Sequence, residues 1–206
     1  FVGTPATPDE YGVLVDGGSA SVMLQKCRFA PGIGTAIALG IPNGPATPPP
    51  PAADPNAPKA EAPVLVDGVT VERCLAKRVN TFITFGSCAN ALVRANTIVD
   101  PVHGYGFVEV PKGYSPVHNS SLLANLFVWG PGVMKSFATA AGGSQPKGLN
   151  LETNLWFSLE LPTAMPILGE FLGTVKSPQT VDLDPKLDGY DRPTAEAAKS
   201  FGWLSA

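Results

Sequence analysis

The sequence is poor in charged residues and in histidine. Of 206 residues 15% are charged, the formal net charge is −3, and histidine occurs twice. A nucleic-acid-binding domain normally carries a basic patch or stripe, and no part of this chain is strongly basic, so we expect no contact with nucleic acid. A surface with so little charge is typical of one that is covered by other protein. We therefore expect the partners to be copies of this chain or other protein subunits.

Cysteine is also scarce, which limits the disulfides and metal sites that the chain can form. The three cysteines, Cys27, Cys74 and Cys88, are an odd number and have none of the paired spacings of zinc or redox sites. At most one internal disulfide can therefore form. In an oxidising compartment a bridge from Cys27 to Cys74 or to Cys88 is open. Buried free thiols that act as small hydrophobic groups are the interpretation that we favour.

A long apolar run is missing as well. The longest one, residues 32–41, has ten residues, whereas a membrane-spanning helix needs about 18. We therefore predict no transmembrane segment. The hydrophobic fraction of 44% is too high for a disordered chain, so a core should form. Because the first residue is Phe1, we favour removal of a targeting segment, and hence an assembly or an extracellular or processed compartment over the free cytoplasm.

Proline and glycine, in contrast, are abundant. Each occurs 22 times, and together they exceed their usual share of roughly an eighth of a globular protein. This predicts many turns and few long elements. We expect a mainly β fold with a few short covering helices, arranged as a sandwich, a barrel or an irregular β-rich structure, with α+β as the alternative. Residues 1–206 should form one domain from which a proline-rich loop protrudes at about 42–63.

That loop contains four consecutive prolines, Pro48 to Pro51, and such a sequence forms polyproline II or irregular loop. Since proline has already fixed φ, less entropy is lost when the segment docks on another surface. We predict an ordered contact loop rather than a free linker between domains.

A pentapeptide that occurs twice flanks the loop. Residues 13–17 and 64–68 both read Val-Leu-Val-Asp-Gly, 51 residues apart, and Leu24 matches Leu75 at the same offset. Asp-Gly after a β-branched run favours a tight hairpin turn. We interpret the two copies as related hairpins, which arose either by an old duplication or by chance similarity of two β-turns.

Local patterns place the other expected elements. Alternating apolar residues predict strands at 79–85, 105–110 and 155–161, the last with Leu155 and Phe157 on its apolar face and Trp156 on its solvent face. Apolar stripes at helical spacing predict short helices that cover the β core. They run from Ser120 or Ser121 to 129, over 133–141 and over 194–204.

Few residues are candidates for chemistry. His103 and His118 follow identical Pro-Val pairs, and with Cys88, Asp100 or Glu109 they could form a metal site. Cys88 with His103 is the best catalytic pair, although the residues around Cys88 lack the flanking pattern of a nucleophile elbow. We interpret both histidines as ordinary loop residues. We predict no catalytic, cofactor-binding or metal-binding residue.

Two further motifs have structural interpretations that we prefer. The acidic run Asp182, Asp184, Asp188 and Asp191 suggests calcium, but it lacks the central glycine and final glutamate of an EF-hand, so we expect a solvated acidic loop. Asn119 begins a glycosylation sequon, which has a meaning only in a eukaryotic secretory route, and we expect a helix N-cap at this point instead.

These observations favour a non-catalytic structural subunit of a symmetric protein assembly, such as a capsid, a tail or an extracellular filament. The N-terminal arm and the proline-rich loop would make the contacts between subunits, for example by adding a strand to a free sheet edge. Two alternatives stay open. One is an accessory or binding subunit of a heteromeric complex, for example an organellar one. The other is an enzyme with a Cys/His site built from Cys88, His103 and His118.

Overall fold

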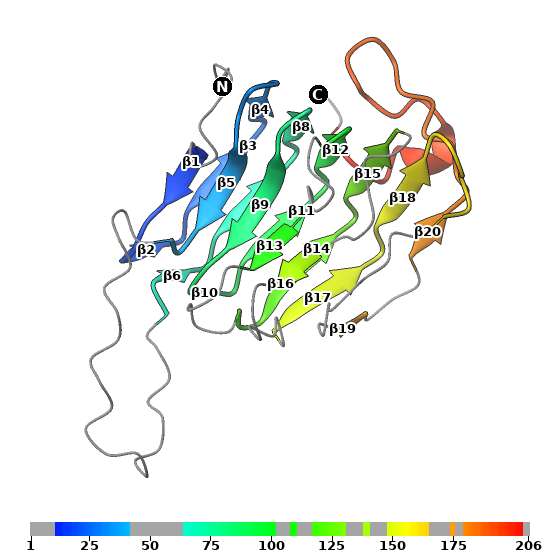
Figure 1. Ribbon diagram of the computed structural model, residues 1–206. Coiled ribbons are helices and arrows are strands. Elements are labelled where there is room, and N and C mark those ends of the chain that lie inside the picture. The colour runs from blue at the N-terminus through cyan, green and yellow to red at the C-terminus, as the bar shows by residue number, and fades with distance from the viewer. Residues whose placement is uncertain are drawn as a thin grey trace, which may run out of the picture.

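The chain winds into a parallel β-helix whose successive coils stack along one axis (Figure 1). The computed structural model describes residues 11–41, 64–101, 108–110, 117–130, 138–140, 148–164, 174–175 and 179–203. The described strands pair in parallel, each with a strand of the coil before or after it. In such a solenoid each coil contacts mainly its neighbours, and the inward side chains form one continuous core.

Six coils contain described strands. Coil 1 consists of β1 (Tyr11–Val15), β2 (Ser19–Ala20), β3 (Met23–Gln25) and β4 (Arg28–Phe29). Coil 2 consists of β5 (Thr35–Leu39), β6 (Val66–Asp67), β7 (Thr70–Glu72) and β8 (Leu75–Lys77). Coil 3 consists of β9 (Thr81–Phe85), β10 (Cys88–Ala89), β11 (Leu92–Arg94) and β12 (Thr97–Val99).

The later coils contain fewer described strands. Coil 4 has β13 (Val108–Val110), β14 (Ser120–Leu123) and β15 (Leu126–Trp129). Coil 5 has β16 (Ala138–Ala140), β17 (Leu149–Glu152) and β18 (Leu155–Ser158). Coil 6 has β19 (Thr174–Val175) and β20 (Thr180–Val181).

Stacking of the coils produces four sheets. Sheet A has the order β1-β5-β9-β13-β16, and sheet B the order β2-β6-β10. Sheet C has the order β3-β7-β11-β14-β17-β19, and sheet D the order β4-β8-β12-β15-β18-β20. In each of the first five coils a two-residue corner leads from sheet C into sheet D. The first residue of that corner is left-handed although it is not glycine, with φ between 48° and 55° at Lys26, Arg73, Ala95, Ala124 and Thr153.

The core is formed by rows of side chains that repeat from coil to coil. In sheet C the inward row is Leu24, Val71, Val93, Leu122, Leu151 and Val175. In sheet D it is Phe29, Ala76, Ile98, Phe127, Trp156 and Val181. Phe127 and Trp156 stack with ring centroids 4.2 Å apart and planes inclined by 9°.

The outer face of sheet D is apolar and is covered by the end of the chain. We call residues 183–203 the C-terminal strap; it contains one turn of 3₁₀ helix, η2 (Glu196–Ala198). Ala198, Phe201 and Trp203 pack on the outward row of the sheet, which includes Leu75, Leu126 and Leu155. Figure 1 shows the strap, coloured orange to red, running from beside β20 back towards β8 and β12.

Polar contacts attach the strap to several coils. The backbone N–H of Trp203 donates to Oγ1 of Thr97 at 2.7 Å, and the guanidinium of Arg28 lies 5.2 Å from the Trp203 ring centroid. Lys77 pairs with Asp191 at 2.8 Å. Gly202 has φ of +72°, and a Cβ there would collide with Thr97 and Leu126, so only glycine allows this close approach.

The mainly β class is confirmed, whereas two predicted helices are wrong. Residues 120–129 form strands β14 and β15, and residues 194–204 contain only the turn η2 among those described. Apolar residues on both sides of the Ala124-Asn125 corner imitate helical spacing, because the corner shifts the phase of the strand alternation. The third helix, 133–141, lies largely outside the described residues, and its described part is strand β16.

The strand predictions fare better but need corrections. The strand predicted at 79–85 is β9, and the described end of 105–110 is β13. The strand predicted at 155–161 is β18, which ends at Ser158, so that Leu159 and Leu161 are exposed. Trp156, expected to face solvent, is fully buried, because it points into the β-helix while the strap covers the other face.

The hairpin interpretation of the pentapeptide is also wrong. The first copy contains β1 of sheet A, while the second contains β6 of sheet B, which pairs in parallel with β2. The structural offset between coils 1 and 2 is 47 residues, since Met23 pairs with Thr70, and not 51. The similarity of the two pentapeptides is therefore not a structural repeat. The predicted contact loop 42–63 and the N-terminal arm lie outside the described residues.

The described residues include no helix that is long and apolar enough to cross a membrane.

Candidate functional site

A ladder of buried asparagines runs along the corner between sheets C and D. Asn96, Asn125 and Asn154 stack in coils 3, 4 and 5, and each is 0% exposed. Oδ1 of Asn125 accepts hydrogen bonds from the backbone N–H and Nδ2 of Asn96 (3.1 and 3.0 Å). Oδ1 of Asn154 accepts the same two bonds from Asn125 (2.9 and 3.0 Å). The ladder thus satisfies polar groups that the corner would otherwise leave buried and unpaired.

The ladder continues into coil 6 and is tied to the sheet at every step. Oε1 of Gln179 accepts bonds from the backbone N–H and Nδ2 of Asn154 (3.2 and 3.1 Å). Each asparagine Nδ2 also donates to a main-chain carbonyl of the inward row one coil back, at Val71, Val93 and Leu122 respectively.

Sequence reasoning missed this ladder, although the sequence contains a signal for it. The three asparagines are 29 residues apart, at positions 96, 125 and 154. Comparison of the chain with itself at this offset would have indicated a solenoid.

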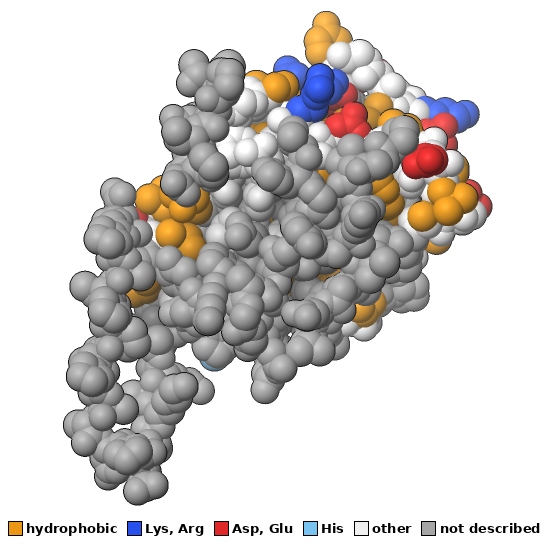
Figure 2. Space-filling view, viewed as in Figure 1, with side chains coloured by type: hydrophobic (Ala, Val, Ile, Leu, Met, Phe, Trp, Pro, Cys, Tyr) orange, Lys and Arg blue, Asp and Glu red, His pale blue; other side chains and the backbone are white. Residues whose placement is uncertain are grey.

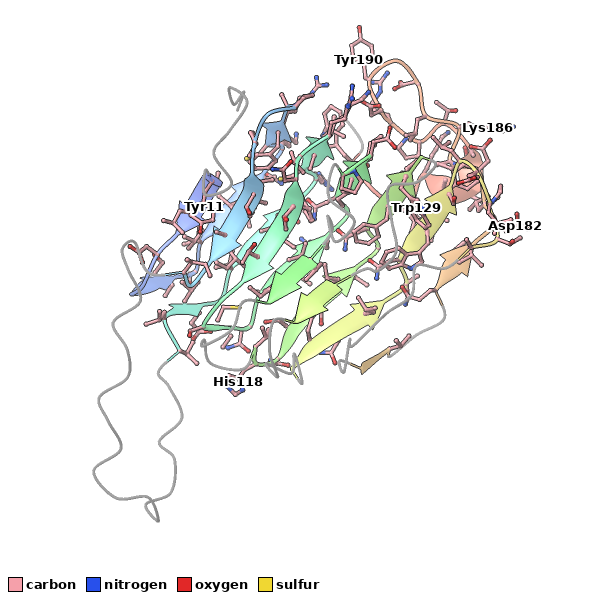
Figure 3. All side chains as sticks on the ribbon, in the orientation of Figure 1. Tyr11, His118, Trp129, Asp182, Lys186 and Tyr190 are labelled. Carbon is pink, nitrogen blue, oxygen red and sulfur yellow. The ribbon has the colours of Figure 1, made fainter. Side chains whose placement is uncertain are left out.

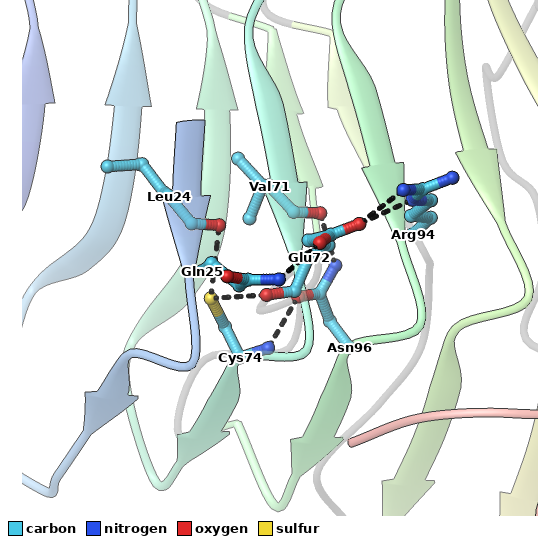
Figure 4. A network of polar contacts seen from close by, with 7 residues as sticks. All are labelled: Leu24, Gln25, Val71, Glu72, Cys74, Arg94 and Asn96. Carbon is cyan, nitrogen blue, oxygen red and sulfur yellow. Dashed lines mark hydrogen bonds and ion pairs between the residues drawn. The ribbon is translucent and has the colours of Figure 1, made fainter. Parts of the chain in front are cut away.

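Towards the first coils the ladder ends in two cysteines (Figure 4). The backbone N–H of Cys74 donates to Oδ1 of Asn96 at 2.9 Å, and its Sγ–H is 3.7 Å from the carbonyl oxygen of Leu24. Cys27 occupies the equivalent position of coil 1, because Arg28 and Leu75 are paired. Burial raises the pKa of Cys74 to about 12. All three thiols are unbridged, and of the two bridges that the sequence left open the structure places Cys74, not Cys88, beside Cys27.

A buried carboxylate lies next to these cysteines on sheet C. Oε1 of Glu72 accepts a hydrogen bond from Nε2 of Gln25, and its Oε2 accepts one from Nε of Arg94, both at 2.6 Å (Figure 4). The hydrogen bond from Arg94, which outweighs desolvation, lowers the pKa of Glu72. Because the charge is neutralised across three consecutive coils, this cluster connects β3, β7 and β11.

The sequence candidates for catalysis do not meet in a nucleophilic pair. Cys88 is fully buried in β10, and burial raises the pKa of its thiol to about 12, partly offset by a hydrogen bond with Ser120. The backbone of His118 does adjoin Cys88, since the His118 N–H donates to the Cys88 carbonyl at 3.0 Å. Its imidazole points away from the coil at the lower rim (Figure 3). His103 lies outside the described residues.

The possible ligands for metal are separated in the same way. Within the described ranges, no group of three or more histidine, cysteine, aspartate or glutamate side chains could hold a metal ion. Asp100 is used differently, because its Oδ1 accepts a hydrogen bond from the backbone N–H of Gly130 at 2.8 Å. The side chain of Glu109 is not among those described.

The acidic run lies on the strap, where Figure 2 shows charged side chains gathered at the upper right. Asp188 accepts hydrogen bonds from the backbone N–H of Tyr190 and from Nε of Arg192 at 2.8 and 2.7 Å, and Asp191 pairs with Lys77. Asp184 accepts a bond from the backbone N–H of Lys186 at 2.8 Å. These carboxylates therefore hold the loop together instead of converging on one ion.

Asn119 belongs to a second, exposed ladder and not to a helix cap. Its Nδ2 donates to Oδ1 of Asn90 at 2.6 Å, and Nδ2 of Asn90 donates to Oδ1 of Asp67 at 2.7 Å. Asn119 has φ of +42°, which asparagine tolerates better than most residues, and Ser120 begins strand β14. The N-cap prediction is therefore wrong.

The two ends of the β-helix form the largest candidate interaction surfaces. In the inward row of sheet C the four central residues are 0% exposed, whereas Val175 in coil 6 is 46% exposed and Leu24 in coil 1 is half-buried. Val181, at the end of the inward row of sheet D, is half-buried too. Around Leu24, coil 1 also exposes Tyr11 (40%) and Met23 (61%).

Backbone groups are available at the same two ends. Among the described strands, β3 and β4 each pair on one side only, and so do β19 and β20. No family model, no curated protein and no solved structure matches the chain.

Proposed function

We propose that the chain is a non-catalytic structural subunit that assembles with copies of itself through the ends of its β-helix. One observation carries this proposal: the inward row of sheet C is fully buried in the middle and exposed at Val175 and Leu24 at its ends. Another copy placed on either end would continue the row and remove this apolar surface from water.

The arrangement of the strands favours head-to-tail stacking. Sheets A, C and D are present in both the first and the last coils of their stacks, and all their strands run in the same direction. A second copy that follows the first along the axis can therefore place its β3 and β4 beside β19 and β20 and extend the parallel sheets. Edge strands readily accept a further strand in this way. A contact of this kind does not close on itself, so it generates a filament.

The test is self-association of two charge variants. Val175→Lys places a charge in the proposed contact, while Tyr190→Lys, on the strap at 62% exposure, places one outside it. A lysine buried in the contact would leave an unpaired charge there. Sedimentation velocity over a range of concentrations should therefore show wild type and Tyr190→Lys assembling equally, and Val175→Lys at least about 100-fold more weakly.

Two results would contradict the proposal. The first is a wild-type chain that remains monomeric at high concentration. The second is equal assembly of the Val175→Lys and Tyr190→Lys variants. An accessory subunit of a heteromeric complex would instead be monomeric when pure and would be recovered from its source in fixed stoichiometry with unlike chains.

A further inference from the structure

We propose that Cys27 and Cys74 form a reversible thiol–disulfide site, which is closed by a small-molecule disulfide of the glutathione class. The site would link coil 1 covalently to coil 2. This inference does not depend on the proposed assembly.

The backbone brings the two cysteines to adjacent positions. Arg28 pairs with Leu75, and the N–H of Leu75 donates to the carbonyl oxygen of Cys27 at 2.9 Å. Neighbouring strands lie about 4.8 Å apart, and a disulfide needs Cα atoms about 4.4–6.8 Å apart. The separation of adjacent coils therefore lies within the range of a disulfide without movement of the backbone.

The ladder also directs the two side chains towards each other. At the equivalent steps, the side chains of Asn96 and Asn125, and of Asn125 and Asn154, are in hydrogen-bond contact at 3.0 Å. Cys74 replaces the asparagine of coil 2, and its Sγ–H is directed to the carbonyl of Leu24, as the Nδ2 of Asn96 is directed to that of Val71. Its thiol therefore points to coil 1, where the Cys27 side chain interacts with it.

Cys88 cannot take part in the same way. It lies in β10 of sheet B, its neighbour in coil 2 is Val66, and its thiol interacts with Ser120. It therefore serves as an internal control.

Access to solvent sets the order of the chemical steps. Cys27 is half-buried, whereas Cys74 is fully buried and its pKa is raised by burial. The Cys27 thiol loses its proton, and the thiolate attacks a sulfur of oxidised glutathione, which releases one glutathione thiolate. Cys74 then loses its proton to solvent and attacks the Cys27 sulfur of the mixed disulfide, which releases the second. Two protein thiols are oxidised to one disulfide, and one glutathione disulfide is reduced to two thiols.

The experiment uses the full reduced chain, incubated natively with oxidised glutathione, then denatured and titrated for thiols. Of three free thiols, one should remain. Trypsin cuts after Lys26, Arg28, Arg73 and Lys77, so mass spectrometry should find the dipeptide 27–28 linked to the tetrapeptide 74–77. Reduced glutathione should restore all three thiols.

Two variants complete the design. Cys88→Ala should still form the bridge, while Cys27→Ser should retain its circular dichroism spectrum and lose the bridge. The proposal is overturned by three thiols that survive oxidation, by a bridge that includes Cys88, by glutathione that stays on Cys27, or by a bridge between chains whose yield falls on dilution.

Discussion

Replacing Asn125 by alanine should destabilise the β-helix more than any exposed polar substitution. The side chain of Asn125 makes four hydrogen bonds: two from Asn96, one to Val93 and one to Asn154. At a net contribution of about 1 kcal/mol each, Asn125→Ala removes about 4 kcal/mol. The loss also leaves the Asn96 N–H buried without its acceptor. Since a domain of this kind is stable by only about 5–15 kcal/mol, the variant should be close to unfolding.

The matched control is Asn119→Gly in the exposed ladder. It loses one exposed hydrogen bond, and glycine tolerates the φ of +42°, so its free energy of unfolding should fall by about 1 kcal/mol or less. Urea unfolding followed by circular dichroism measures both variants, and hydrogen exchange should show lost protection at the Asn96 amide in Asn125→Ala alone. If the two variants are equally stable, the ladder does not hold the corner as argued.

Two further predictions concern the acidic cluster and the strap. Because Arg94 lowers the pKa of Glu72 from its ordinary 4.5, the carboxylate stabilises the fold above the unfolded-state pKa, and this stability is lost as pH falls through the lower folded pKa. Glu72→Gln should therefore unfold at lower urea than wild type at neutral pH, with a difference that shrinks in acid; a constant difference contradicts this. Trp203 is 8% exposed, and Trp203→Ala should cost about 3–5 kcal/mol, measured by urea unfolding. It should also increase proteolysis within the strap, and unchanged proteolysis would show that Trp203 does not hold it.

The β class could be predicted from composition, because proline, glycine and short apolar alternations leave room for little else. The coil pattern was harder to detect, since the coils differ in length: Met23 pairs with Thr70, 47 residues on, Thr70 with Leu92, 22 residues on, and Leu92 with Ser121, 29 residues on. A repeat search at one fixed offset loses its signal under such insertions. The asparagines of coils 3 to 5 keep a constant spacing and are the exception.

The covering of the outer face of sheet D could not be predicted from local pattern. Leu155 and Phe157 are apolar on one face of β18 and Trp156 on the other, which the sequence alone presents as a half-buried strand. The strap that buries the outer face comes from residues 183–203, and no short-range signal indicates where it docks. The same holds for Cys27 and Cys74, whose proximity depends on the register of two coils.

The strap has a consequence for the way in which the chain reaches its final state. A solenoid whose coils contact only their neighbours can form progressively as the chain leaves the ribosome. Here Arg28 and Thr97, in coils 1 and 3, receive their partner Trp203 only after nearly the whole chain has been made. Until then the apolar outer row of sheet D stays open to solvent along its length. Nascent chains should therefore pass through a stage in which this one sheet is exposed to chaperones, and translation of the last twenty or so residues ends that exposure.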